Sequence, residues 1–221
     1  MFDEIATKLE AWGVFPVAVL ETAAQAERLG EALLEAGLPC VEVTFRTGAA
    51  GEAIARLSKT FSDLLVGAGT VLTVDQARQA RDLGARFVVS PGFDSAVVDY
   101  CMHCGLAVFP GVVTPSEMLQ VLSRGLRVAK FFPAEAAGGV GFLKAVAGPL
   151  RDLRFIPTGG ISPANLSDYL AQPNVLACAG TWIANRKDLA EGNTEKIMRQ
   201  AAEALSVAAS ARQKRGGTTH A

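Results

Sequence analysis

The stretch Phe15-Pro16-Val17-Ala18-Val19-Leu20 is an uninterrupted apolar run of strand length. A segment with helical periodicity, residues 23–36, separates it from a second strand-like run at Cys40–Phe45. Strands that are apolar on both faces are typical of parallel sheets covered by helices on their faces. The first 45 residues therefore predict a strand–helix–strand unit, and the same pattern repeats along the chain.

Eight such strands are predicted, and a helix-period segment follows each of them. The strands are Phe15–Leu20, Cys40–Phe45, Leu64–Gly67, Arg86–Val89, Leu106–Phe109, Arg127–Phe131, Arg154–Pro157 and Val175–Ala179. The helices are Ala23–Ala36, Ala49–Thr60, Val74–Leu83, Ser95–Cys104, Pro115–Ser123, Gly141–Ala147, Pro163–Ala171 and Lys187–Ala209, and a further one opens the chain at Phe2–Trp12. This repetition predicts a (β/α)8 TIM barrel of one domain, residues 1–209, with an extra N-terminal helix. The alternative is a doubly wound open sheet. Residues 210–221 are predicted to form a flexible tail.

Composition and charge argue against a nucleic-acid partner, a membrane span and a secretion signal. Half of the 221 residues are hydrophobic, and the net charge of -1 argues against a nucleic-acid partner. The apolar runs are far shorter than a membrane span. The first eight residues lack a basic region followed by an apolar stretch, so we predict a cytoplasmic protein.

The four cysteines indicate no disulfide framework, but Cys101 and Cys104 have the C-x-x-C spacing of metal and redox sites. A structural zinc site needs four ligands. Beyond His103, the chain has only His220 in the tail. We therefore expect these cysteines to belong to a helix rather than to a metal or redox site.

Lys130 is the most informative single residue. It ends an apolar run and is followed by Phe131, Phe132 and Pro133. Burial in apolar surroundings favours the neutral amine, and a neutral amine is a nucleophile toward carbonyls. The alternative is a strand-end lysine that keeps its charge in water.

Two further charged residues lie on the second predicted strand and at its end. Glu42 interrupts an apolar strand and needs a partner if it is buried, which Lys130 would provide. As an alternative to a structural ion pair, Glu42 is a candidate general acid/base. Arg46 is suited to a substrate carboxylate, although a surface salt bridge is the more common role of such an arginine.

Small and hydroxyl residues gather at the carboxyl ends of the predicted strands, where barrel enzymes place their active sites. Thr158-Gly159-Gly160 follows the seventh strand and Gly180-Thr181 follows the eighth. In barrels these two loops commonly bind phosphate through backbone N–H groups. The pattern indicates a phosphate ester as substrate.

Several motifs resemble those of the KDPG/KHG aldolase family, whose members act on 2-keto-3-deoxy-6-phosphogluconate (KDPG) and 4-hydroxy-2-oxoglutarate (KHG). They are Val41–Thr47, Val66–Leu72, Ser90-Pro91-Gly92, Lys130–Glu135 and Pro157–Ile161. The resemblance extends in register over nearly the whole chain. It implies a class I aldolase of the Entner–Doudoroff route, a homotrimer of (β/α)8 barrels without cofactor or metal.

The resemblance also implies roles for individual residues. Lys130 matches the Schiff-base lysine and Glu42 the acid/base. The residues that match the substrate site are Arg46 and Thr70 for the carboxylate, Pro91 and Phe132 for the pyruvyl pocket, Thr158 for the hydroxyls, and Gly159, Gly160, Gly180 and Thr181 for the phosphate. Thr181 stands where serine is expected, and Glu21 stands where some relatives carry a base.

The predicted function is the cleavage of KDPG to pyruvate and glyceraldehyde 3-phosphate. One alternative is mainly the cleavage of KHG to pyruvate and glyoxylate. The others are a phosphate-binding barrel enzyme without a covalent step and a non-catalytic protein that binds sugar phosphates.

Overall fold

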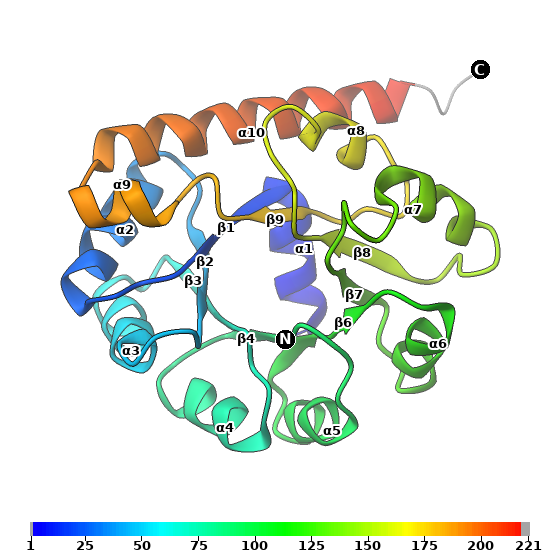
Figure 1. The fold of residues 1–221 in the computed structure, drawn as a ribbon, viewed down its shortest axis with the longest axis horizontal. Coiled ribbons are helices and arrows are strands. Elements are labelled where there is room, and N and C mark those ends of the chain that lie inside the picture. Colours follow the sequence, from blue (N-terminus) through cyan, green and yellow to red (C-terminus); the bar gives the residue numbers. More distant parts are fainter. Residues whose placement is uncertain (1, 218–221) are drawn as a thin grey trace.

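A computed structural model describes residues 2–217 and shows an α/β fold in which parallel strands curve around a core, with the helices that follow the first one outside them (Figure 1). In chain order the elements are α1 (Phe2–Trp12), β1 (Val14–Ala18), α2 (Ala23–Glu35), β2 (Cys40–Thr44), α3 (Ala50–Thr60), β3 (Leu65–Gly69), α4 (Val74–Asp82), β4 (Phe87–Val89), α5 (Ser95–His103), β5 (Ala107–Phe109), β6 (Gly111–Val112), α6 (Pro115–Ser123), β7 (Val128–Phe131), α7 (Gly139–Ala147), β8 (Arg154–Pro157), α8 (Leu166–Leu170), β9 (Cys178–Gly180), α9 (Arg186–Glu191) and α10 (Thr194–Gly217). No helix within residues 2–217 combines the length and the apolar composition needed to cross a membrane.

The strands form two parallel sheets, ordered β5-β4-β3-β2-β1-β9 and β6-β7-β8. The predicted parallel α/β fold is thus confirmed, whereas a single continuous ladder of eight strands is not observed. The chain passes from one sheet to the other at Pro110, which has no N–H to donate. Between β8 and β9 only the isolated bridges Phe155–Val175 and Thr158–Ala179 are formed.

The apolar residues of each strand fall into two layers. Ala129 and Phe131 of β7 pack toward the outer helices, whereas Val128 faces an inner cluster that also contains Cys40 of β2. Because successive side chains of a strand point to opposite faces, Lys130 shares the inner face with Val128, and Glu42 shares it with Cys40. Both charged residues are therefore placed inside the curved sheets.

Helix α1 covers the inner cluster at the end where the strands begin. Its buried residues Ile5, Ala6 and Leu9 pack against inner residues such as Phe15 and Phe109. Burying a side chain such as Ile5 or Leu9 contributes roughly 1.5–3 kcal/mol. The predicted N-terminal helix is confirmed, and with α1 at this end, the opposite end of the strands remains for a site.

Two predictions about individual elements were wrong, and one strand was not predicted. The predicted helix Lys187–Ala209 is broken because Gly192 ends α9 in the left-handed region, at φ 68°. The two-residue strand β6 was not predicted. The last strand begins only at Cys178, because Val175 makes no more than an isolated bridge.

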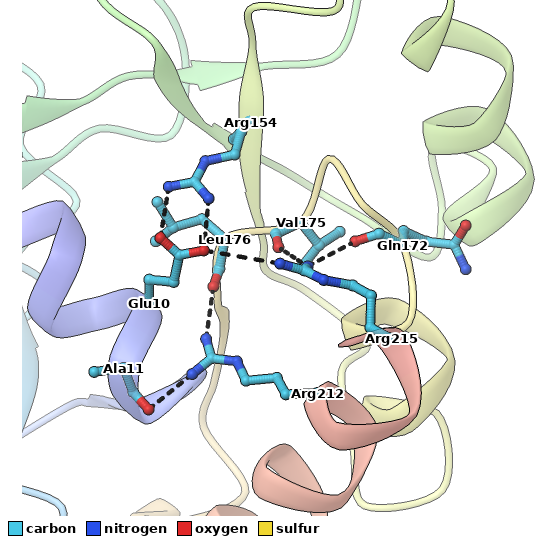
Figure 2. Close-up of polar contacts among 8 residues, drawn as sticks. All are labelled: Glu10, Ala11, Arg154, Gln172, Val175, Leu176, Arg212 and Arg215. Atoms are coloured by element: carbon cyan, nitrogen blue, oxygen red, sulfur yellow. Dashed lines mark hydrogen bonds and ion pairs between the residues drawn. The ribbon is translucent and has the colours of Figure 1, made fainter. Parts of the chain in front are cut away.

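The predicted flexible tail was also wrong over residues 210–217, because α10 continues to Gly217. Arg212 donates to the carbonyl oxygens of Ala11 (2.7 Å) and Leu176 (3.1 Å), and Arg215 donates to those of Gln172 and Val175 (Figure 2). These bonds attach α10 to the end of α1 and to the segment before β9, where only isolated bridges join β8 and β9. The remainder of the predicted tail, residues 218–221, lies outside the described residues.

Replacing Arg212 with methionine is expected to lower the free energy of unfolding by about 1–2 kcal/mol, since the carbonyl of buried Leu176 loses a charged donor. Arg199→Met is the control, because Arg199 lies on the same helix and its one ion pair within residues 2–217 is an exposed contact with Glu203 at 4.0 Å. Urea unfolding of both variants measures the difference. Equal losses would show that the Arg212 contacts do not stabilise the fold.

Candidate active site

Glu42 and Lys130 meet inside the fold although they come from different sheets. Glu42 lies in the middle of β2, in register with Val17 and Gly67, and Lys130 lies on β7, in register with Gly111 and Ile156. Lys130 Nζ is 3.7 Å from Glu42 Oε1, and the two residues are 4% and 1% exposed. The predicted pair is therefore present as a buried ion pair, longer than a hydrogen bond. Both Glu42 oxygens lack a hydrogen-bond partner among the described residues.

Two glycines of β3 make room for buried side chains, one of which is Glu42. A Cβ on Gly69 would lie 2.0 Å from Glu42 Oε1, and one on Gly67 would lie 2.2 Å from the Phe87 ring. A side chain at either position would force its neighbour to move. The glycines in the stretch 66–70 are thus required by the Glu42 carboxylate and by an aromatic ring of the inner cluster.

Burial raises the pKa of the Glu42 carboxyl, and the nearby charges of Lys130 and Arg46 partly offset that rise. A carboxyl whose pKa is raised can hold a proton closer to neutral pH than a free glutamate, as a general acid requires. A carboxyl that lacks a hydrogen-bond partner and lies beside a buried amine is able to exchange protons with a group bound at that amine. The geometry therefore allows acid/base chemistry at the Lys130 amine.

Arg46 and Thr70 lie together at the carboxyl ends of β2 and β3. Arg46 Nε donates to Thr70 Oγ1 at 3.1 Å. Thr70 has φ 55°, in the left-handed region that a β-branched residue rarely adopts. Backbone strain of this kind is concentrated at functional sites. The strained residue places its hydroxyl against a guanidinium whose remaining donors suit a carboxylate.

Phe132 and the loop of Pro91 flank the lysine. The Phe132 ring centroid is 4.9 Å from Lys130 Nζ, within reach of a cation–π contact when the amine is charged. Gly111, the register partner of Lys130, lies so close to the Pro91 loop that a Cβ on it would be 2.2 Å from the Pro91 carbonyl oxygen. Both predicted pocket residues are thus beside the strand segment that carries Lys130.

The loop after β8 is attached to the loop after β7. Ala134 N–H donates to Thr158 O (2.8 Å) and Glu135 N–H donates to Gly159 O (3.1 Å). A Cβ on Gly159 would lie 3.2 Å from the Phe132 ring, and one on Gly160 would lie 2.4 Å from Glu135 Cγ. These glycines, at φ 93° and 82°, are therefore required locally by packing and by backbone conformation.

Two residues that contact these loops or belong to them, Tyr169 and Glu135, were not predicted to contribute to the site. The Tyr169 hydroxyl, from α8, donates to Glu135 Oε1, and Glu135 in turn covers Gly160. Glu135 belongs to the lysine motif, so its position in the sequence was a usable signal. Tyr169 had none, because an aromatic residue on a predicted helix is usually a core residue.

Gly180 ends the last strand and Thr181 follows it, and the two residues face different neighbours. The Trp182 ring fills the space beside Gly180, where a Cβ would lie 2.0 Å from the indole. Thr181 is exposed and lines a cavity of about 420 Å³ that Arg46 also lines. Thr181 and the predicted carboxylate-binding residue Arg46 thus share one open space at the carboxyl ends of the strands. Glu21 lies near that space, 3.9 Å from Arg186.

The C-x-x-C pair belongs to α5 and its end. Burial and the adjacent Cys104 raise the pKa of the Cys101 thiol to about 12, which disfavours the thiolate that redox and metal chemistry need. In residues 2–217 no three His, Cys, Asp or Glu side chains gather as metal ligands do. His220 lies outside the described residues.

Comparisons with known proteins agree with this fold. A family model described as "Aldolase: KDPG and KHG aldolase" matches residues 5–200. The 2-dehydro-3-deoxy-phosphogluconate aldolase of Treponema pallidum is 45% identical over 90% of this chain and 95% of its own length.

Two solved structures are also similar. The KDPG aldolase of Legionella pneumophila, crystallised with pyruvate captured at low pH as a covalent carbinolamine intermediate, has a TM-score of 0.87 and 38% identity over 89% of this chain and 96% of its own. The aldolase of Zymomonas mobilis ZM4 with 3-phosphoglycerate has a TM-score of 0.86 and 38% identity, covering 94% and 97%. The fold is therefore that of an α/β aldolase, and the protein is a carbon–carbon lyase. Within that class, this chain belongs to the KDPG and KHG aldolase family.

Proposed function

We propose that this protein is a class I aldolase that cleaves KDPG to pyruvate and glyceraldehyde 3-phosphate through a Schiff base on Lys130. The observation that carries the proposal is the Lys130 amine buried 3.7 Å from the Glu42 carboxylate, inside a fold whose strand ends carry Arg46 and Thr70. The carbinolamine described for the Legionella pneumophila aldolase supports the same covalent route.

The covalent step begins with attack of the neutral Lys130 amine on the C2 carbonyl of the substrate, which gives a carbinolamine. Glu42 delivers a proton to the departing hydroxyl, water leaves, and an iminium forms. The short distance between Glu42 and Lys130 favours this proton transfer, because a positioned general acid or base typically accelerates a reaction by about 10²–10⁴-fold.

Carbon–carbon cleavage uses the iminium as an electron sink. Glu42, directly or through a water molecule, takes the C4 hydroxyl proton. The C3–C4 bond then breaks to release glyceraldehyde 3-phosphate, and its electron pair becomes the enamine of pyruvate. Protonation at C3 and hydrolysis return the free amine and pyruvate. Arg46 and Thr70 hold the carboxylate so that the scissile bond stands perpendicular to the iminium plane.

The remaining residues supply the rest of the substrate site in this proposal. Pro91 and Phe132 line the pyruvyl pocket, and Thr158 lies near the substrate hydroxyls. Gly159, Gly160, Gly180 and Thr181 bind the phosphate through backbone N–H groups and the Thr181 hydroxyl. The test is a coupled assay in which lactate dehydrogenase reports pyruvate formed from KDPG. Absence of pyruvate with folded protein would refute the function.

A second candidate substrate is KHG, which has no phosphate. The contact between Glu21 and Arg186 favours it, because a carboxylate beside the open cavity repels a dianionic phosphate. The ratio of kcat/KM for the two substrates decides between them.

Replacing Thr181 with alanine is expected to raise KM for KDPG by roughly tenfold and to leave KHG cleavage unchanged, since a hydrogen bond to a charged group is worth about 1.5–3 kcal/mol. Steady-state kinetics on both substrates measure the effect. Equal losses on the two substrates would mean that Thr181 supports the fold rather than the ligand.

The proposal also covers the closure of the barrel, the oligomeric state and the cellular location of the enzyme. One domain, residues 1–209 with the continuation of α10, closes its two sheets into a (β/α)8 barrel and assembles as a cytoplasmic homotrimer. The family resemblance supports the closed barrel and the trimer, and the lack of a signal-peptide pattern in the first eight residues supports the cytoplasmic location. Light scattering in solution tests the assembly, which should have three times the chain mass of 23.1 kDa.

A further inference from the structure

The cavity at the end of β9 carries positive charge from two directions. It is lined by Arg46 from the end of β2, by Thr181, and by Asn185 and Arg186 at the start of α9, over an apolar base of Val17 and Val19. Among residues 2–217, no Asp or Glu lines it. Its volume of about 420 Å³ is within the range of small-molecule sites.

Of these lining residues, Arg46 and Asn185 are already engaged with protein groups. Arg46 Nε donates to Thr70. The Asn185 side chain caps α9 by accepting from the Asp188 N–H at 3.0 Å. Arg186 is more weakly engaged. Its one ion pair among the described residues is with Glu21, at 3.9 Å between Nη2 and Oε1. The Arg186 and Glu21 side chains are 65% and 57% exposed. An exposed pair at this distance is weak and exchanges easily with another anion.

We infer that Arg186 is a specificity-determining residue that binds the distal phosphate of the substrate and leaves Glu21 when it does so. The inference rests on the proposed function and deepens it. Arg46 receives the carboxylate at one end of the substrate, and Arg186, lining the same cavity, receives the phosphate at the other. The substrate class is therefore a keto acid with an anionic group at each end.

Glu21 has the opposite effect in this arrangement. It competes with the phosphate for Arg186 and places a negative charge near the cavity, so it weakens the binding of phosphorylated substrates. The balance between Arg186 and Glu21 sets how strongly the enzyme prefers a phosphorylated sugar acid. Removing either charge should shift that preference, and the two shifts should have opposite signs.

The experiment compares KDPG with 2-keto-3-deoxygluconate, which differs only in lacking the phosphate. Arg186→Gln should raise KM for KDPG on the order of tenfold to a hundredfold, the worth of a hydrogen bond to a charged group. The kcat of this variant on KDPG should not change, because the lost contact stabilises the bound substrate and the transition state equally. Its kinetics on 2-keto-3-deoxygluconate should not change either, because that substrate has no phosphate. Glu21→Gln should lower KM for KDPG.

Lys187→Gln is the matched control, since Lys187 is the next residue and carries the same charge. Its one ion pair in the described part of the chain is with Glu191 on the surface of α9, at 4.0 Å. The replacement should change KM for KDPG less than twofold, in line with the small worth of exposed pairs. If Arg186→Gln behaves like this control, or weakens both substrates equally, the inference is wrong.

Calorimetric titration with inorganic phosphate separates this inference from the proposed function, because it needs no turnover. Wild type should bind phosphate and Arg186→Gln should bind it at least tenfold more weakly, by the same hydrogen-bond estimate. Should wild type release no pyruvate from KDPG, the aldolase proposal fails while this titration still decides the role of Arg186. Equal phosphate binding by the two proteins would overturn the inference.

Discussion

Lys130→Arg is expected to reduce cleavage of KDPG to the background rate while the protein remains folded. A guanidinium stays protonated under all assay conditions and cannot form an imine, so the covalent route is lost. The positive charge beside Glu42 is retained, which avoids leaving a buried carboxylate without a partner. The coupled pyruvate assay, with a thermal melt to verify folding, measures the result.

Lys144→Arg provides the control for this variant. Lys144 lies on the exposed surface of α7, and its replacement should leave kcat unchanged. Substantial turnover by Lys130→Arg would show that Lys130 acts only through its charge, which is the alternative of a barrel enzyme without a covalent step.

Glu42→Gln is expected to lower kcat by about 10²–10⁴-fold, the usual worth of a general acid/base. The amide keeps the shape of the side chain and removes the titratable group. Steady-state kinetics and circular dichroism separate a catalytic loss from a folding defect. Glu27→Gln, which removes an exposed carboxylate paired with Arg56, should be nearly neutral. A near-normal rate in Glu42→Gln would assign the proton transfers to another group.

The pH dependence of these two proteins gives a second readout. Because burial raises the pKa of Glu42, its base form appears only above the usual glutamate pKa, and kcat of wild type should rise with pH through that elevated value. The Gln variant should lack this limb. For stability the sign is opposite: the preference for the protonated form stabilises the fold below the usual value of 4.5 and is lost as pH rises through the raised pKa. Wild type should therefore lose stability relative to Glu42→Gln over that interval.

The sequence was sufficient to predict the central pair. The alternation of side chains along a strand places Glu42 with Cys40 and Lys130 with Val128, so each charged residue faces inward once the strand is identified. Which strands lie opposite each other follows from the parallel α/β repeat. The distance of 3.7 Å does not follow from pattern, because it depends on the curvature of two separate sheets.

The residues that the sequence did not reveal act through contacts between distant segments. Arg212 and Arg215 looked like tail residues, yet they bond to backbone carbonyls that no local pattern marks as needing donors. The break at Gly192 had a local signal, a glycine before an asparagine, but the helical periodicity on both sides obscured it.

The glycines at the strand ends illustrate a different limit. Their number at one end of the sheet predicted close approach of a ligand. Gly160 and Gly180 are also required by the Glu135 side chain and the Trp182 ring, so packing alone accounts for the missing Cβ at both positions. The glycines therefore do not decide whether this end of the sheet binds phosphate. The Thr181→Ala and Arg186→Gln variants do.

The most direct test of the covalent mechanism is incubation with pyruvate followed by borohydride reduction and peptide mapping. A Schiff base on Lys130 predicts one reduced pyruvyl group per chain, located on Lys130, and no adduct in Lys130→Arg. An adduct on Lys144, or no adduct on any lysine, would contradict the account.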